Sequence, residues 1–204
     1  NRSDRGLTRI QRCVRDKHVT IIENMRCCGI IEVYGNFNYN KNEILDLGQV
    51  SEFESGTSII REGLSLGSHY VVGWAGVNPA NGEPLYYDLD GNVTNVFSDG
   101  NATANWGSSN PEYTGGYGLR GTLGNFDFST LFTFADEYYR FNNQSFFQEN
   151  ANFSQFNLST VMNTMWTQPG DVTEVQSYLF PRQFSSKDIE DASFTKWRNL
   201  TVGY

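Results

Sequence analysis

Acidic side chains are the residues of this 204-residue chain most suited to catalysis, because paired carboxylates at a defined separation hydrolyse glycosidic bonds. Three local pairs occur: Asp88 with Asp90, Asp136 with Glu137, and Glu190 with Asp191. Adjacent residues on a strand point to opposite faces, so the last two pairs cannot converge on one substrate atom. No GxSxG or GxGxxG motif is present, and His18 and His69 have no motif around them. The sequence therefore predicts a protein that is not an enzyme.

Metal binding has one candidate, the run from Asp88 to Asn92 (DLDGN). It is similar to the start of a calcium loop, but the glycine falls at position 4 and position 12 is Asp99 instead of glutamate. A turn in which Asp and Asn bond their own backbone explains the run better. The three cysteines, Cys13, Cys27 and Cys28, have no zinc-type spacing and are interpreted as incidental thiols. We predict no metal and no cofactor, with isolated calcium ligation as an open alternative.

Aromatic side chains among Asn, Asp and Gly are the candidate binding residues. An exposed ring can stack on the apolar face of a sugar while nearby amides and carboxylates bond its hydroxyls. The alternative for each ring is a place in the core of a loop or in an interfacial girdle. The candidates for substrate binding are Trp74, Tyr86, Tyr87, Trp106, Tyr113 and Trp166.

Charge is distributed unevenly along the chain. The net charge of −8 argues against a nucleic-acid partner, which needs clustered Lys and Arg. Residues 1–33 hold seven basic and four acidic residues, whereas residues 34–204 hold eight basic and nineteen acidic ones. We therefore expect two parts, an atypical basic segment at 1–33 that contains all three cysteines, and the remainder at 34–204.

Three segments have the period-two pattern of strands. From Ile31 to Asn40 the odd positions are mostly apolar and the even positions mostly amide, which fits a strand with one dry and one wet side. Residues 117–123 and 126–134 alternate on either side of Gly124-Asn125, a good hairpin turn, and the return strand is expected to reach as far as Arg140. A third strand starts at Phe194 and alternates cleanly only from Asn199, so its front half is expected to lie outside hydrocarbon.

Two long connections separate these strands. Residues 73–115 are predicted to form one loop with short strand pieces, and residues 142–193 another loop with a helix from Thr160 to Trp166 capped by Asn157 or Ser159. Loops of about 40 residues are uncommon in compact soluble domains but usual on the extracellular side of outer-membrane barrels. The expected fold is all-β, an antiparallel section of a large transmembrane β-barrel with long extracellular loops.

Four blocks, in order, resemble SusC/RagA-type TonB-dependent transporters of Bacteroidetes. They are NFNYNKNEILDL at residues 36–47, GWAGVNPANGEPLYYDLDGNVT at 73–94, MWTQPGDVT at 165–173 and SSKDIEDASFTKWRNLTVGY at 185–204. The residues that match the family motifs are Gly76, Asn78, Pro79, Gly82, Asp88, Asp90, Gly91, Pro169, Gly170, Asp171, Glu190, Asp191, Ser193, Phe194, Asn199, Gly203 and Tyr204. Met165 stands where the family commonly has Arg. Residues 1–30 do not resemble the family, and are interpreted either as a divergent strand pair or as a mis-framed segment.

The resemblance implies a fragment of a barrel of about twenty-two strands, without its plug and its last strands. It implies import of an oligosaccharide, or of a peptide, across the outer membrane. The implied partners are TonB, acting through an absent N-terminal region, a SusD-like surface lipoprotein and outer-membrane lipid. The alternative from another class is a secreted, soluble β-sandwich that binds carbohydrate.

Overall fold

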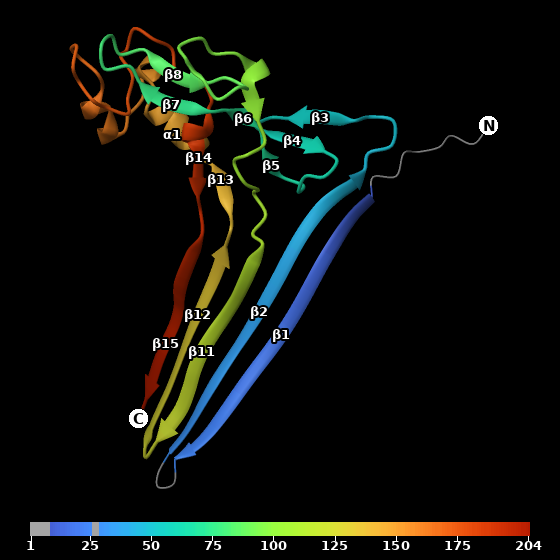
Figure 1. Cartoon of the computed structure of the whole chain (residues 1–204). Helices are drawn as coiled ribbons and strands as arrows, with labels where there is room; N and C mark the ends of the chain where they lie inside the picture. The colour runs from blue at the N-terminus through green and yellow to red at the C-terminus, as the bar shows by residue number, and fades with distance from the viewer. Residues whose placement is uncertain (1–8, 26–28) are drawn as a thin grey trace.

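The computed structural model describes residues 9–25 and 29–204. The predicted incidental thiols Cys27 and Cys28 lie outside the described residues. A long, twisted sheet extends from one end of the molecule, and the connecting segments gather into a cap at the other end (Figure 1). Among the described residues, no helix is both long and apolar enough to cross a membrane.

The long sheet is antiparallel throughout, with the order β1-β2-β11-β12-β15. Its strands are β1 (Arg9–Met25), β2 (Gly29–Asp46), β11 (Tyr113–Leu123), β12 (Phe126–Asp136) and β15 (Phe194–Gly203). All three predicted period-two segments are therefore strands, and the predicted all-β, antiparallel class is confirmed. Residues 9–25, for which the sequence indicates no sustained alternation, pair with β2 over their whole length.

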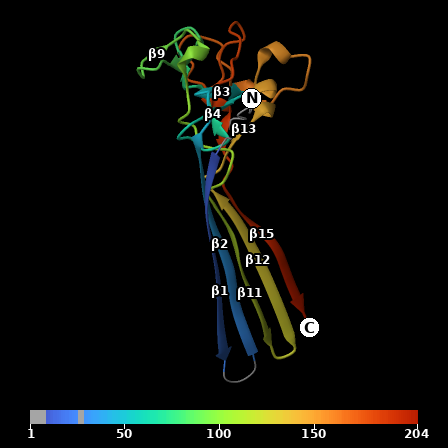
Figure 2. The ribbon, with the colours of Figure 1, turned by 90° about the vertical axis from the view of Figure 1, so that its right-hand side faces the viewer.

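One face of this sheet is apolar. Directly opposite residues in an antiparallel pair share a face, and the register aligns Val33 with Leu119 and Tyr117 with Phe132. This apolar face is made of Ile31, Val33, Phe37, Tyr39, Tyr117, Leu119, Leu123, Phe126, Phe128, Phe132, Phe134, Trp197, Leu200, Val202 and Tyr204. Within the part of the chain that the structure describes, no second sheet covers it, and the strands form a single layer (Figure 2). A two-sheet sandwich, the alternative from the sequence, is not the arrangement found.

The opposite face is polar. It carries Glu32, Asn36, Asn38, Asn40, Thr114, Arg120, Thr122, Asp127, Ser129, Thr133, Lys196, Asn199 and Thr201, together with Tyr34 and a minority of apolar residues, Ile30, Leu131, Ala135 and Phe194. Arg120 forms a bidentate ion pair with Glu32, with Nε to Oε2 at 2.7 Å and Nη2 to Oε1 at 3.1 Å. The dry and wet sides expected for the strand at Ile31 to Asn40 are thus confirmed and continue across the neighbouring strands.

The hairpin between β11 and β12 has the predicted two-residue turn. Leu123 pairs with Phe126, so Gly124 and Asn125 are the two central residues. Gly124 has φ of +62°, a left-handed conformation that glycine adopts without steric cost, as at the first central position of a type II′ turn.

A β-bulge in β15 explains why its alternation changes phase. Leu131 pairs with Asn199 and Phe132 with Trp197, which leaves Arg198 as the extra residue. The bulge keeps Trp197 on the same apolar face as Leu200, and the Trp197 ring stacks on Phe132 at 5.8 Å between centroids. The loss of alternation before Asn199 is therefore a local register shift; Trp197 continues the apolar face into the front half of β15, whereas Phe194 lies opposite Ala135 on the other face.

The return strand ends earlier than the sequence suggested. β12 stops at Asp136, because Glu137 takes a left-handed backbone conformation with φ of +52°. The chain resumes as β13 (Tyr139–Phe141), which pairs with β14 (Ile189–Asp191) instead of continuing toward β15. This second ribbon leads from the sheet into the cap (Figure 1).

The cap contains three small sheets and several short helices. The sheets are β3-β4-β5, β10-β6 and β7-β8-β9. Their strands are β3 (Glu52–Ser55), β4 (Ser58–Arg61), β5 (Ser68–His69), β6 (Val71–Val72), β7 (Trp74–Val77), β8 (Pro84–Tyr87), β9 (Val93–Thr94) and β10 (Ala102–Thr103). The predicted strand pieces within 73–115 are confirmed, although Tyr113 to Gly115 already belong to β11.

The helices of the cap are short. The predicted helix at Thr160 to Trp166 is a 3-10 helix, η3 (Thr160–Thr164), with Ser159 accepting a hydrogen bond from the Val161 amide. The α-helix α1 (Asn143–Gln148) was not predicted. The other 3-10 helices are η1 (Asp99–Asn101), η2 (Ala151–Phe153) and η4 (Ser186–Asp188).

Candidate functional site

The cap holds five of the six candidate binding residues, all except Tyr113. Its centre is a cluster of Val72, Tyr86 and Ala102, with Tyr70, Trp74 and Phe97 packed around it. Val72, Trp74, Tyr86 and Ala102 come from β6, β7, β8 and β10, elements of two to four residues each, and Tyr70 and Phe97 come from the connecting segments between strands. Such short strands cannot bury an apolar face alone, so they are held by packing against one another.

Tyr86 belongs to the core of the cap and is not an exposed ring. Its side chain is 1% exposed, and it meets Trp74 and Phe97 edge to face at 5.7 Å and 5.2 Å. Burial raises the pKa of the Tyr86 hydroxyl to about 12. The expectation of an exposed ring is wrong for Tyr86, because β8 turns it toward β6 and β10.

Trp106 and Trp166 also contribute to internal packing. The Trp106 indole donates to the Val71 carbonyl at 3.1 Å, and the Trp166 indole donates to the Pro79 carbonyl at 3.0 Å. Gly82, with φ of +75°, makes room for Trp166, since a β-carbon there would lie 2.6 Å from the ring. Both indole N–H groups are thus engaged within the chain.

The remaining two candidates are separated from each other. Tyr87 is 41% exposed on the surface of the cap and keeps its ring available for stacking. Tyr113 is the first residue of β11, not part of a loop, and its ring lies 5.1 Å from Tyr39 and 5.9 Å from Phe37 at the upper end of the apolar face. The structure therefore places Tyr113 among the aromatic residues at the end of the sheet nearest the cap, which fits the alternative position that the sequence left open.

Two of the family blocks, about ninety residues apart, meet at Pro79. Its carbonyl accepts from the Gly170 amide at 2.8 Å as well as from the Trp166 indole. Asn78 holds the turn around Pro79, with its side chain accepting from Ala80 N at 3.0 Å. Gly76, with φ of +112°, stands at the irregularity in the β7–β8 pairing that precedes this turn. These motif residues therefore fix how the two loops of the cap pack together.

Acidic motif residues stabilise turns in the cap. The Asp88 carboxylate accepts from Asp90 N and Asn92 N at 2.9 Å and 2.8 Å, so the DLDGN run forms the predicted turn, with Gly91 at φ of +82°. These hydrogen bonds, above all those from Asn92, lower the pKa of Asp88. Among the described residues, no group of three or more potential metal ligands comes together.

Asp171 stabilises the turn around Pro169 and Gly170 through hydrogen bonds to its carboxylate. Its carboxylate accepts from Thr167 N and Gln168 N, both at 3.0 Å, and from the Thr167 hydroxyl at 2.9 Å. The hydrogen bonds from Thr167 and Gln168 lower the pKa of Asp171. A 570 Å³ hollow lies beside this turn, between Val161 and Glu174.

The last block places its acidic residues on one ribbon. Glu190 and Asp191 are neighbours on β14, so they point to opposite faces as predicted. Glu190 accepts from Asn142 Nδ2 at 2.8 Å, and Asp191 accepts from the Ser193 amide at 2.9 Å. Beyond them, Phe194, Asn199 and Gly203 lie in β15, and Tyr204 packs on Phe126 with 4.9 Å between ring centroids.

A buried ion cluster, which the sequence did not indicate, lies inside the second loop. Arg182 Nη2 is 2.5 Å from Asp188 Oδ1, and both side chains are buried. Burial raises the pKa of the Asp188 carboxyl, against the opposing charge of Arg182. Arg182 also donates to the Ser145 carbonyl at 2.7 Å, and Glu149 is 3.7 Å from Arg182 and 3.5 Å from Lys187. The one sequence signal was Ser185 three residues before Asp188, whose carboxylate accepts from the Ser185 amide.

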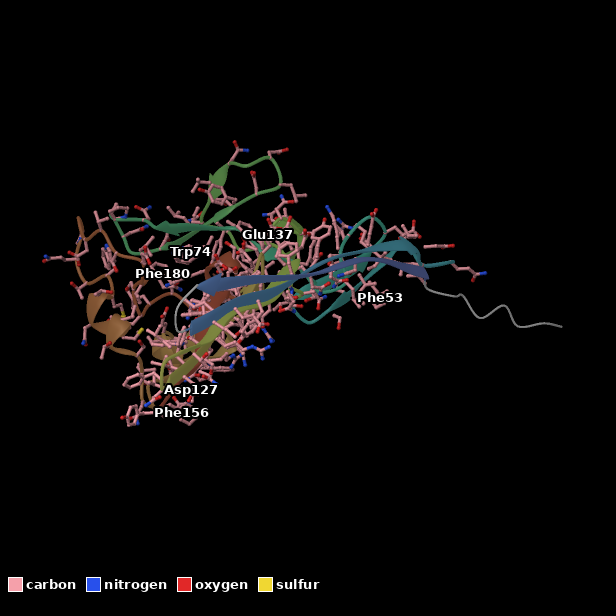
Figure 3. All side chains as sticks on the ribbon, turned by 90° about the horizontal axis from the view of Figure 1, so that it is seen from below. Phe53, Trp74, Asp127, Glu137, Phe156 and Phe180 are labelled. Carbon is pink, nitrogen blue, oxygen red and sulfur yellow. The ribbon has the colours of Figure 1, made fainter. Side chains whose placement is uncertain are left out.

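The cluster connects the two loops of the cap. Lys187 lies 5.4 Å from the centre of the Trp74 ring, and Trp74 N donates to Ser186 Oγ at 2.9 Å. Burial lowers the pKa of Lys187, and the Arg182 charge lowers it further. Figure 3 shows Trp74 and Phe180 on one side of the cap and Phe53 on the other. The cap offers hollows and rings suited to binding.

Comparison with known proteins finds a TonB-dependent receptor and solved structures of the RagAB importer. No protein-family model matches the chain. A TonB-dependent receptor of Formosa agariphila is 26% identical over 223 residues, which cover 83% of this chain and 21% of the receptor. The structure of the RagAB peptide importer in the closed-closed state aligns with a TM-score of 0.85 at 25% identity, over 95% of this chain and 22% of that one. The structure of the RagAB peptide transporter aligns with a TM-score of 0.86 at 24% identity, over the same shares. The chain spans about a fifth of the length of these relatives.

Proposed function

We infer that this chain, a TonB-dependent receptor sequence of the SusC/RagA type, forms part of the barrel wall and two extracellular loops of an outer-membrane importer. The observation that carries this inference is the uncovered apolar face of the β1-β2-β11-β12-β15 sheet. A soluble protein rarely leaves so many large apolar side chains side by side on its surface.

Lipid tails are the surroundings that fit the apolar face. A strand of about 9–11 residues crosses the hydrocarbon region, and strands of outer-membrane barrels alternate between apolar outward residues and polar inward ones. β11, β12 and β15 have 11, 11 and 10 residues, while β2 has 18 and continues into the cap. The strands of this sheet are long enough to cross an outer membrane in a closed barrel of about twenty-two strands.

The polar face then lines the lumen through which the substrate passes. Asn36, Asn38 and Asn40 on β2, with Thr114 and Thr133 on neighbouring strands, offer neutral hydrogen-bonding groups. Such groups suit a hydrated substrate that must bind and also leave. We propose import of an oligosaccharide or an oligopeptide, energised by TonB through another part of the protein, and no enzymatic reaction.

The cap is placed to contact the substrate and a surface partner. It lies at the end of the sheet opposite the short turn at Gly124-Asn125, which is the arrangement of long extracellular loops and short periplasmic turns. We propose that a SusD-like surface lipoprotein covers this cap. Tyr87 is the candidate ring that remains exposed for stacking on a substrate, so Tyr87→Ala should weaken substrate binding.

Fractionation and uptake test the proposal. In the native host, the full-length protein should be found in the detergent-extracted outer membrane, and deletion of TonB should abolish uptake of its substrate. Recovery in the soluble fraction, or uptake that is unchanged without TonB, would contradict the proposed function.

A further inference from the structure

A hollow of about 310 Å³ opens where the two loops of the cap meet. It lies between the β3–β4 turn, β6, η1 and the segment Gln183-Phe184. Figure 1 shows the β3–β4 hairpin reaching toward β6 at this place. The volume is at the lower end of the range for ligand pockets, about 300–1,000 Å³, which suits one side chain of a larger substrate.

Three aromatic rings form walls of the hollow, from Tyr70, Phe97 and Phe184. Two of them are held in place by other rings. Phe97 meets Tyr86 edge to face at 5.2 Å, and Phe184 stacks on Phe146 with 3.8 Å between centroids. The walls are therefore fixed before any ligand arrives, which lowers the entropic cost of binding.

Two carboxylates, Glu54 and Asp99, are also part of the lining, and no Lys, Arg or His is. Glu54 lies opposite Ile59 in the β3–β4 pairing, so the two side chains share a face; Ile59 is buried, whereas Glu54, like Asp99, is exposed to solvent at the hollow. Neither carboxylate has an ion pair or a hydrogen bond with another described residue. The hollow therefore combines uncompensated negative charge with aromatic walls.

The cap already contains cations in surroundings of this kind. In each case a cationic group lies over a ring and beside a carboxylate: Arg61 over Tyr70 with Glu52, Arg182 over Phe146 with Asp188, and Lys187 over Trp74 with Glu149. A ring face attracts a cation through its quadrupole, and a carboxylate adds a charge-assisted hydrogen bond. Of the three rings of the hollow, Tyr70 already lies under Arg61, whose partner is Glu52; Phe97 and Phe184 lie under no cation of the described residues, and the lining that carries Glu54 and Asp99 includes no Lys or Arg.

We propose that this hollow binds an alkylammonium or guanidinium group, the side chain of a lysine or arginine in an imported peptide. The inference rests on the proposed import function and specifies the substrate for it. The aliphatic part of such a side chain packs against Val71 and Val72, and its charged head reaches Glu54 and Asp99. A neutral residue of the same length loses both electrostatic contributions.

Equilibrium binding to the purified full-length transporter tests the proposal. The probes are N-acetylated alanyl-lysyl-alanine and its norleucine counterpart, which has a similar length but no charge. The lysine peptide should bind about fivefold more tightly, because a partly exposed cation–π contact and a solvent-screened charge-assisted hydrogen bond are both lost with norleucine. Glu54→Gln combined with Asp99→Asn should remove this difference. Glu43→Gln, which removes the same charge from the exposed surface of β2 outside the hollow, should leave it unchanged.

The possible outcomes distinguish a failure of the proposed site from a failure of the proposed import function. Equal binding of the two peptides to the wild type, or a difference that survives in the double variant, would overturn the proposed site. Uptake that still depends on TonB in that case would leave the import function intact. A glucosamine trimer compared with its N-acetylated form provides the second source of amines. If only the amino sugar binds in a manner that depends on Glu54 and Asp99, the assignment to a peptide is wrong.

Discussion

The substitution Asp188→Asn probes the buried ion cluster most directly. It preserves the size of the side chain but leaves the Arg182 guanidinium, itself buried, without its 2.5 Å partner. Removing one member of a buried pair costs about 3–5 kcal/mol, because the other charge stays in a poorly solvating place. We expect about 3 kcal/mol, the lower end, since Glu149 at 3.7 Å and the Ser145 carbonyl still contact Arg182.

Hydrogen exchange measured by mass spectrometry on the full-length protein is the assay. A loss of about 3 kcal/mol in local opening free energy accelerates exchange about 150-fold, because each 1.36 kcal/mol is a factor of ten. The acceleration should be confined to peptides from α1 and from the segment around η4. Peptides from β11 and β12, in the sheet, should exchange at the wild-type rate.

The double variant Arg182→Met with Asp188→Leu is the control for the physical cause. Replacing both charges by apolar groups removes the pair without leaving a lone buried charge, which is often nearly neutral for stability. Its exchange should therefore lie much nearer to the wild type than that of Asp188→Asn. If the double variant opens as readily as the single one, the reasoning from an uncompensated charge is wrong.

Three further predictions follow from individual residues. Deleting Arg198, the extra residue of the bulge, should restore one-to-one pairing and keep Trp197 and Leu200 on the apolar face, so the temperature at which the barrel unfolds on gels should change little. Deleting the regularly paired Thr201 should instead move Val202 to the wrong face, at about 1.5–3 kcal/mol for each large apolar side chain moved, and lower that temperature; an equal drop for both deletions would refute the bulge. Gly82→Ala should lower the local opening free energy of the cap, measured by hydrogen exchange, by more than about 2 kcal/mol, because φ of +75° and the Trp166 ring both oppose a β-carbon. Gly91→Ala has open space around the new β-carbon, so only the left-handed backbone conformation opposes it, at about 1–2 kcal/mol. Because the pKa of Asp171 is lowered in the folded protein, its carboxylate stabilises the 167–171 turn at pH values above its ordinary pKa and loses this effect as the pH falls through the lowered pKa. Protection of this turn from hydrogen exchange should therefore persist at pH 4 and disappear only in stronger acid; a loss of protection already near pH 5 would contradict this.

Much of the sheet could be predicted from the sequence, because alternation is a local property. Each side chain on a strand points opposite to its neighbour, so the apolar positions from Ile31 to Tyr39 and from Phe126 to Phe134 identify one face without knowledge of the partner strand. The turn at Gly124-Asn125 is equally local, since its conformation depends on the two residues themselves.

The register between distant strands depended on the tertiary structure. The pairing of β2 with β11 joins residues more than seventy positions apart, and only this pairing aligns Val33 with Leu119. The bulge at Arg198 is likewise visible only when β12 lies beside β15. In the sequence the same feature resembles a loss of alternation, because one extra residue reverses the phase of every side chain that follows.

The cap was the least predictable part, for a physical reason. Strands of two to four residues are too short to show a period, so the sequence could not separate the buried ring of Tyr86 from the exposed ring of Tyr87. Arg182 and Asp188 resemble ordinary surface charges until α1 and Phe146 enclose them. The sequence by itself determined the two faces of the sheet and the four blocks that resemble the transporter family, because these depend on local geometry and on the order of residues along the chain. Only the packing of the two loops against each other decided which rings are buried, which charges are paired and where a hollow opens.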